Sequence, residues 1–236
     1  MENELLRFDK SKRIVFIDCE TLNLCLNFCQ NLPWQVAMLY TIGGKKVDER
    51  DLLIKWDTNL KISEDARRIT RYPEELIRTT GKKFDDVFGT IRDWLDSSDY
   101  IIGHNILGFD LYLIKEMYLL KGLRANHLVN KILDTNCLAK GIKYGIPKMS
   151  KETLIEYQYK LLHTYRKGIK TNLTALGKDY NIDHDYDNLH NAIVDAGGNF
   201  IIDAVLVRPG YHQLMAKIGD RHLIRLPGNP QSAVIG

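Results

Sequence analysis

The stretch Val15-Phe16-Ile17-Asp18-Cys19-Glu20-Thr21 places two acidic residues directly after an apolar run. The β-branched and aromatic residues of Arg13–Ile17 predict a buried β-strand. Side chains two apart lie on one face of a strand, so we expect Asp18 and Glu20 to point the same way. Neighbouring carboxylates at the edge of a core repel and lose hydration unless a cation neutralises them, and Mg²⁺ or Mn²⁺ prefers such ligands. The triplet is compatible with a metal site, but it is common, and taken alone it is better explained by two solvated acids after the end of a strand.

A third acidic residue follows a polar turn near the middle of the chain. A short apolar strand ends at Gly103, and Asp110 then lies in the first turn of a helix predicted over Phe109–Leu120. A carboxylate there is favoured by the positive end of the helix, which by itself explains Asp110. Asn105, in the turn, is suited to hold the loop or to donate to a substrate.

The last acidic residue of interest lies in an apolar segment. We predict a long helix over Asn191–Val207, in which Asp195 is surrounded by small and apolar residues. A lone acid in such surroundings usually has a partner, and a metal ion is one choice. His190 precedes it by five residues, and a histidine whose pKa is near neutral can take a proton from water. A capping or surface histidine explains His190 equally well when it is taken alone.

In combination these motifs are specific: D-x-E on a first strand, N-x4-D at a helix start and H-x4-D on a late helix. Together they resemble the DEDD superfamily of exonucleases, which has the ribonuclease H-like (DnaQ-like) fold. The histidine places the chain with the DEDDh branch, because the sibling branch has tyrosine where this chain has Asn191. The resemblance covers Arg13–Val207 and implies an α/β fold with a mixed central sheet flanked by helices.

The resemblance also implies a metal-dependent 3′→5′ exonuclease that releases nucleoside 5′-monophosphates. Two divalent cations, Mg²⁺ or Mn²⁺, would be held by Asp18, Glu20, Asp110 and Asp195. His190 would accept the proton of the attacking water, Thr21 and Leu22 would contact the terminal nucleotide, and Asn105 would assist from its loop. Asp134 has no metal role in the family pattern and is interpreted as structural.

A cation-rich segment extends from Ala139 to Lys178. It contains nine Lys and Arg residues but only two glutamates, and tyrosines are interleaved with the cations. Cations with aromatic rings suit a single strand of nucleic acid, whereas a solvated lysine-rich surface also explains the composition. We expect Arg166, Lys167 and Lys170 to guide the strand.

Three alternatives stay open at this point. The first is a 3′→5′ exoribonuclease or oligoribonuclease, because no reader of the 2′-hydroxyl is evident. The second is a proofreading subunit that acts with a DNA polymerase or another replication protein. The third is a non-catalytic nucleic-acid-binding module, since a fold does not guarantee a function. Over these alternatives we favour a 3′→5′ exonuclease that acts on single-stranded DNA.

The bulk composition fits one soluble domain. The chain has 236 residues, 44% of them hydrophobic and 27% charged, with a formal net charge of +3. We expect a single exonuclease domain, with a core of about 13–207 and a C-terminal extension over 208–236. No apolar run is long enough for a membrane span, and the acidic N-terminus does not resemble a signal peptide, so we expect a cytoplasmic protein. The four cysteines have no C-x-x-C spacing, which makes disulfides or a zinc site unexpected.

Overall fold

The computed structural model describes residues 11–26, 31–57, 62–70 and 72–182, together with the backbone of strands at 201–208, 211–218 and 221–225. The strands are β1 (Arg13–Thr21), β2 (Pro33–Ile42), β3 (Lys45–Lys55), β4 (Lys82–Lys83), β5 (Tyr100–Gly103), β6 (Ile132–Asp134), β7 (Ile201–Arg208), β8 (Tyr211–Ile218) and β9 (Arg221–Arg225). The helices are α1 (Glu64–Thr70), α2 (Glu74–Thr80), α3 (Phe84–Ser97), α4 (Asp110–Leu120), the 3₁₀ helix η2 (Asn126–Lys131), α5 (Thr135–Tyr144), α6 (Leu154–Leu162) and α7 (Leu173–Asp179).

The central sheet is mixed and has the strand order β4-β3-β2-β1-β5-β6. β1, β2 and β3 pair antiparallel as a meander, while β5 lies parallel to β1 on its other side and β6 lies parallel to β5. The parallel connections contain helices, as crossovers between parallel strands require. This arrangement confirms the predicted α/β class with a mixed sheet and flanking helices.

The β2–β3 connection shows how local sequence sets this topology. Gly43 and Gly44 both have positive φ, at 57° and 77°. Two left-handed residues in succession form the kind of turn that matches the twist of antiparallel strands, and glycine adopts that conformation without a steric penalty. The two adjacent glycines therefore account for the tight turn between β2 and β3.

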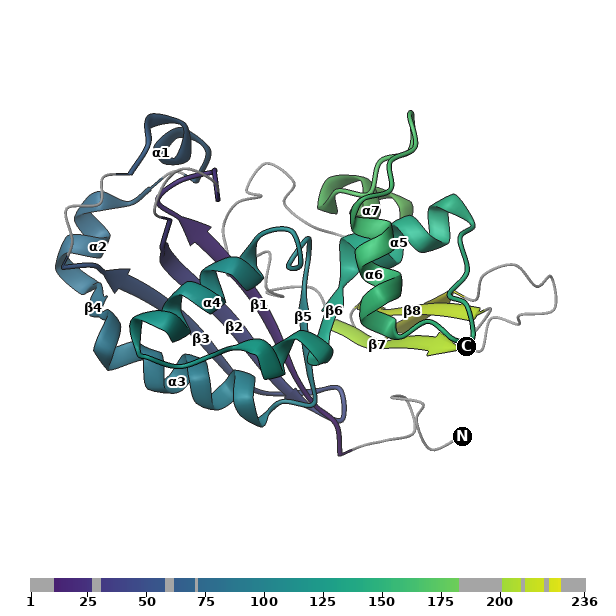
Figure 1. Ribbon diagram of the computed structural model, residues 1–236, viewed down its shortest axis with the longest axis horizontal. Helices are drawn as coiled ribbons and strands as arrows, with labels where there is room; N and C mark the ends of the chain where they lie inside the picture. Colours follow the sequence, from purple (N-terminus) through teal and green to yellow (C-terminus); the bar gives the residue numbers. More distant parts are fainter. Residues whose placement is uncertain are drawn as a thin grey trace.

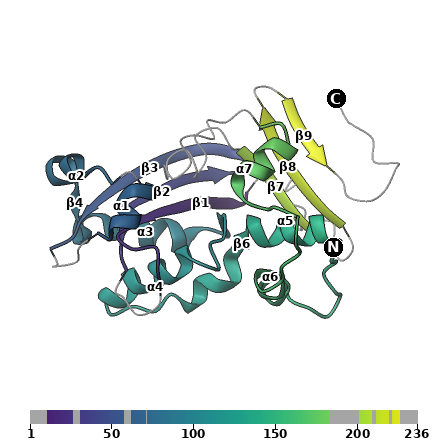
Figure 2. The same ribbon diagram turned by 90° about the horizontal axis from the view of Figure 1, so that it is seen from above.

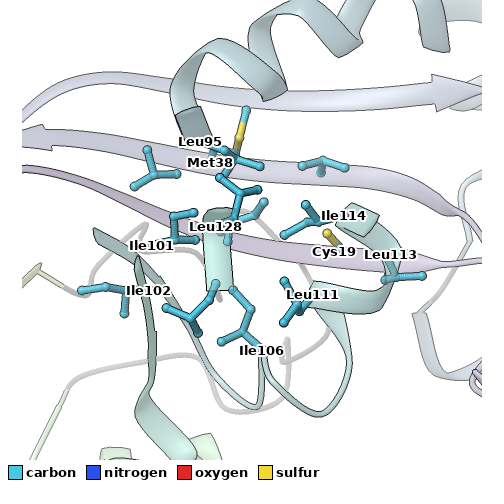
Figure 3. Close-up of a cluster of buried hydrophobic side chains, with 14 of the residues drawn as sticks. Cys19, Met38, Leu95, Ile101, Ile102, Ile106, Leu111, Leu113, Ile114 and Leu128 are labelled. Atoms are coloured by element: carbon cyan, nitrogen blue, oxygen red, sulfur yellow. The ribbon is translucent and has the colours of Figure 1, made fainter. Parts of the chain in front are cut away.

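The main core lies between the sheet and helices α3 and α4, which cover one of its faces (Figures 1 and 2). The apolar residues of α3 recur at helical spacing and are buried, and Ile91 and Leu95 are fully enclosed. α4 contributes Leu113 and Ile114, which lie beside Cys19 of β1 in the close-up of the cluster (Figure 3). This packing fixes the start of α4 close to the end of β1.

The C-terminal region differs from the sequence prediction. A helix was expected over Asn191–Val207, but Ile201–Arg208 forms strand β7, which pairs antiparallel with β8. β7, β8 and β9 form a separate three-stranded sheet. The expected core boundary at about residue 207 stays a prediction. Isoleucine and valine are frequent in this segment, and β-branched residues favour a pleated strand once a partner strand is available. Residues 191–200 lie outside the described residues.

Two smaller expectations can be compared with the structure. Cys19, Cys25 and Cys137 form no disulfide within the described part of the chain, and Cys29 lies outside it. Within the part of the chain that the structure describes, no helix is long and apolar enough to cross a membrane.

Candidate active site

β1 presents the first two carboxylates from within the strand. The strand continues to Thr21, with Asp18 opposite Ala37 and Glu20 opposite Gln35 of β2, so it is longer than the sequence indicated. Alternation therefore places Asp18 and Glu20 on the same face, as predicted. Glu20 is only 5% exposed and Asp18 is half-buried. The solvated alternative does not apply to Glu20.

Asp110 is brought to β1 by a hydrogen bond that no local pattern encodes. The pairing of β5 with β1 reaches only Phe16 opposite Ile102, because β5 ends at Gly103. Beyond that point the backbone N–H of Cys19 donates to Oδ1 of Asp110 at 3.0 Å. The carboxylate thus satisfies a strand N–H where the ladder has stopped, and it joins the start of α4 to the middle of the D-x-E motif.

The loop between β5 and α4 is held by the buried carboxylate of Asp134. Its Oδ1 accepts from the backbone N–H of Asn105 at 3.1 Å and its Oδ2 from that of Leu107 at 3.0 Å. Oδ1 also accepts from Cys137 at 3.1 Å, which caps α5. Asn105 has a left-handed backbone, with φ at 62°, inside this loop. Asp134 therefore sets the conformation of the segment that precedes Asp110, in agreement with a structural role.

These elements enclose a pocket of about 420 Å³. Its walls come from β1, the end of α1, the β5–α4 loop and the start of α7. The lining residues are Asp18, Cys19, Glu20, Thr21, Leu24, Ile69, Thr70, His104, Asn105, Phe109, Asp110, Asn172, Leu173 and Thr174. Three predicted metal ligands and two predicted substrate contacts therefore share one cavity, of a size that suits one small ligand.

Burial dominates the electrostatics of the pocket. It raises the pKa of Asp110 to about 7, against the lowering effect of the N–H groups that the carboxylate accepts, and the charge of Asp134 adds to the increase. Burial also lowers the pKa of His104 to about 4. The His104 ring is held by Thr135, whose Oγ1 lies 3.0 Å from its Nδ1. At neutral pH the histidine of this pocket is therefore uncharged, so it adds no positive charge beside the carboxylates.

The donor set of the pocket fits a hard divalent cation. Asp18, Glu20 and Asp110 supply carboxylate oxygens, the ligands that Mg²⁺ and Mn²⁺ prefer. Burial raises the pKa of Asp110, and a cation bound beside it would favour the charged carboxylate. Among the described residues, however, no three His, Cys, Asp or Glu side chains are gathered closely enough to hold a metal ion. The other predicted members of the site, Asp195 and His190, lie outside the described residues.

Leu22 does not have the surroundings expected of a substrate contact. Its side chain is 5% exposed and packs in a second apolar cluster with Leu32, Trp34 and Ile77. Its backbone N–H donates to Leu32, and its carbonyl accepts from Ser63. The backbone of Leu22 is thus hydrogen-bonded within the protein, and its side chain is packed in an apolar cluster.

Thr21 does line the pocket, but its hydroxyl already donates to the carbonyl of Asn23 at 2.6 Å. Of Leu22 and Leu24, it is Leu24, 42% exposed, that lines the cavity.

The three predicted strand-guiding cations lie on the loop between α6 and α7 and do not line the pocket. All three are exposed. Nη1 of Arg166 donates to the carbonyl of Tyr144 at 2.7 Å, so this cation is engaged within the protein. Lys167 and Lys170 form no ion pair within the described part of the chain.

Several pocket residues escaped sequence reasoning. His104 and Phe109 adjoin residues of the N-x4-D motif, so their position beside the motif could have indicated them. Leu24, and the α7 wall that begins at Asn172, gave no signal because they reach the pocket through tertiary contacts.

A match to a family model now places the chain in a class. The model described as exonuclease, RNase_T, matches residues 15–199. The chain therefore belongs to this exonuclease family, which confirms the resemblance seen in the carboxylate motifs. Among curated proteins, none matches the chain in sequence.

Solved structures support the fold. E. coli Exonuclease I in complex with a dT13 oligonucleotide has a TM-score of 0.60 at 17% identity, over 79% of this chain and 39% of that one. The zinc-bound form of the E. coli ExoI–ssDNA complex has a TM-score of 0.62 at 16% identity, over 79% and 38%. This chain thus spans about two fifths of their length, and the likeness establishes the ribonuclease H-like fold.

Proposed function

We propose that the chain is a metal-dependent 3′→5′ exonuclease that releases nucleoside 5′-monophosphates from single-stranded ends, with DNA favoured over RNA. The observation that carries this proposal is the meeting of Asp18, Glu20 and Asp110 at one cavity of about 420 Å³. The family match supports the same chemistry. A confined cavity favours one terminal nucleotide over the middle of a duplex.

The residues have distinct roles in this proposal. Asp18, Glu20, Asp110 and, outside the described residues, Asp195 would hold the divalent cations, whose chemistry is the activation of water and the neutralisation of phosphate charge. The N–H of Cys19 fixes Asp110, so this ligand is oriented before substrate binds. His190 would accept the proton of the attacking water.

The walls of the pocket suit a nucleotide. Leu24 and Phe109 provide apolar surface for a base, and Thr21 and Asn105 provide polar groups near the carboxylates. Leu24 takes the role that the sequence prediction gave to Leu22. A base covered by apolar side chains with a few polar groups around it is the usual composition of a small-ligand pocket.

The preference for DNA is part of the proposal. One of the similar structures is described with dT13, which is a property of E. coli Exonuclease I and supports single-stranded DNA as the first substrate to try. Another similar structure is an ExoI/SSB-Ct complex. It makes a replication protein a reasonable partner to test, and a polymerase partner stays a prediction.

The test uses 5′-labelled single-stranded DNA and the matching RNA, each with Mg²⁺, Mn²⁺ or EDTA. We expect a metal-dependent ladder that shortens from the 3′ end, faster on DNA. Asp18→Asn should abolish it. Asp51→Asn is the matched control, because Asp51 lies on β3, accepts from Gln35 at 2.8 Å and does not line the pocket.

Each outcome has a defined meaning. Cleavage that survives Asp18→Asn, or that needs no metal, would contradict the proposed site. Faster cleavage of RNA would replace the substrate with RNA, and no cleavage of either strand would favour the binding-module alternative.

A further inference from the structure

The loop between α6 and α7, residues 163–172, presents an aromatic ring to solvent. In Figure 1 this loop rises beyond α7 at the upper edge of the molecule, the edge where α1 also lies. Tyr165 is 80% exposed, more than any other large hydrophobic residue of the described chain. The loop ends at Asn172, which lines the pocket. The exposed ring and the pocket wall thus belong to one continuous segment.

The loop is braced from both sides of Tyr165. Thr164 donates through its N–H to Leu161 at 3.0 Å and through its hydroxyl to Lys160 at 2.7 Å. Arg166 donates to the carbonyl of Tyr144 at 2.7 Å, and its guanidinium lies 5.4 Å from the centre of the Tyr144 ring. The residues before and after Tyr165 are therefore fixed on α5 and α6, so the ring is held out and has little freedom to fold back.

The cations that follow Tyr165 differ in what they contact. Arg166 is used to brace the loop, whereas Lys167 and Lys170 are exposed and form no ion pair among the described residues. The carbonyl of Lys170 accepts from Nζ of Lys143, and this bond holds the backbone at Lys170. The side chain of Lys170 is exposed to solvent. The exposed ring of Tyr165 and two lysines that form no ion pair among the described residues thus lie on the same braced loop.

We propose that Tyr165 is a base-stacking platform for a nucleotide upstream of the reacting 3′ end, with Lys167 and Lys170 holding the adjoining phosphates. Stacking on an exposed ring with nearby cations is the usual way of binding a single strand without reading its sequence. Tyr165 and Asn172 are seven positions apart, so the platform lies within about 25 Å of the pocket wall. The inference rests on the proposed function, because it assumes that a strand leaves this pocket.

The test compares strand lengths. Binding of oligothymidylates of about 4 and about 16 nucleotides is measured by fluorescence anisotropy in EDTA, so that no strand is cleaved. We expect the full chain to bind the longer strand more tightly. Tyr165→Ala should weaken binding of the longer strand by roughly tenfold and remove most of its advantage, since stacking contributes at this scale. Tyr165→Phe should retain the advantage, because the ring face is kept.

A matched control and a second readout separate stacking from general surface effects. Met149→Ala removes another exposed apolar side chain, 64% exposed on the loop between α5 and α6, and should leave both affinities unchanged. Lys167→Gln with Lys170→Gln should reduce the slope of log affinity against log salt by about 1.4, the value for two phosphates of a single strand. Lys148→Gln with Lys151→Gln, the same charge change on the other loop, should not.

The outcomes distinguish this inference from the function on which it rests. Equal affinity of Tyr165→Ala and the unaltered chain for the longer strand overturns the platform, even if cleavage proceeds normally. An identical loss at both lengths also overturns it, because the ring would then act at the pocket. A length-dependent loss in a chain that binds but does not cleave supports the platform and rejects the proposed catalysis. A protein or peptide partner at Tyr165 would leave the length dependence unaltered by every variant.

Discussion

Leu22 and Leu24 are two positions apart, but their side chains have different surroundings. Leu22 is buried among Leu32, Trp34 and Ile77, whereas Leu24 is 42% exposed and faces the cavity. Leu22→Ala should lower the free energy of unfolding by about 2–5 kcal/mol, because it leaves a cavity in a packed cluster. Leu24→Ala should change stability by less than about 0.5 kcal/mol and raise KM for the strand.

Urea unfolding and steady-state kinetics on the two variants measure both effects. The reverse pattern, with a stability loss at Leu24 and a KM effect confined to Leu22, would restore the sequence-based assignment of the substrate contact.

Asp134 contributes to the site without lining the pocket. Its carboxylate accepts from the N–H groups of Asn105, Leu107 and Cys137, and it is completely buried. In Asp134→Asn an NH₂ group replaces one acceptor, which leaves buried N–H groups unsatisfied at a cost of about 1–3 kcal/mol. We expect kcat to fall more than KM rises, because the loop that precedes Asp110 loses its fixed conformation.

Thr153→Ala is the control for a general loss of stability. Thr153 caps α6 with a reciprocal pair of hydrogen bonds to Glu156, away from the pocket, and its removal should cost about 1 kcal/mol. If Asp134→Asn and Thr153→Ala lower the melting temperature alike and neither changes kcat, Asp134 has no positioning role.

At the scale of elements, the junction of β5 and α4 is tightly packed. A Cβ at Gly103 would lie 2.9 Å from Cβ of Ile106 and 3.0 Å from the carbonyl oxygen of Ile17. The backbone of β1 cannot move aside without disturbing Asp18, so Gly103→Ala should destabilise the fold by about 1–3 kcal/mol and reduce cleavage. Thermal melting and the ladder assay measure the two effects.

Gly89 provides the comparison for that substitution. It lies in α3, and a Cβ built there meets nothing within 4 Å. Gly89→Ala should stabilise the helix by about 0.5–1 kcal/mol with no change in cleavage. Equal effects of the two substitutions would show that the junction tolerates a side chain.

The sequence predicted those elements whose signal is local. Two adjacent glycines indicate the hairpin at Gly43-Gly44, and apolar residues at helical spacing indicate α3. The alternation of side chains along β1 places Asp18 and Glu20 on one face. Motif spacing also indicated Asp110, but the bond from Cys19 that fixes it spans 91 positions and has no local signature.

Features that depend on contacts between distant segments were not evident from the sequence. Leu22 is buried against Trp34 and Ile77 of other elements, which the motif before it does not indicate, and its role as a substrate contact stays a prediction. The helix predicted over Asn191–Val207 failed at β7 because β-branched residues are compatible with both periodicities until a partner strand, here β8, is present.

At the scale of the whole molecule, burial of titratable groups in the pocket makes stability depend on pH. The pKa of Asp110 is raised to about 7 in the fold, so between its ordinary value and 7 the native protein binds a proton that the unfolded chain has released. Stability from this group is present at low pH and is lost as pH rises towards and through 7. The pKa of His104 is lowered to about 4, which acts in the opposite direction: stability is lost as pH falls from about 6.5 to 4. Between about pH 4 and 6.5 the effects of the two groups on the free energy of unfolding offset each other. Above about pH 6.5 only the effect of Asp110 remains.

We therefore expect the metal-free protein to melt at a lower temperature at about pH 8 than at about pH 6, and Mn²⁺ to raise the melting temperature more at the higher pH. The reason is that a metal ligand must be deprotonated, so cation binding competes with the proton on Asp110 below its pKa of about 7. Each unit of pKa shift corresponds to ~1.4 kcal/mol, so the effect should be measurable by calorimetry. Asp110→Asn is the control: it removes the titrating carboxylate and should abolish both the pH dependence above pH 6.5 and most of the stabilisation by Mn²⁺. An equal Mn²⁺ effect at both pH values in the unaltered chain would mean that the cation does not bind at Asp110, and the metal site would then have to be sought elsewhere in the molecule.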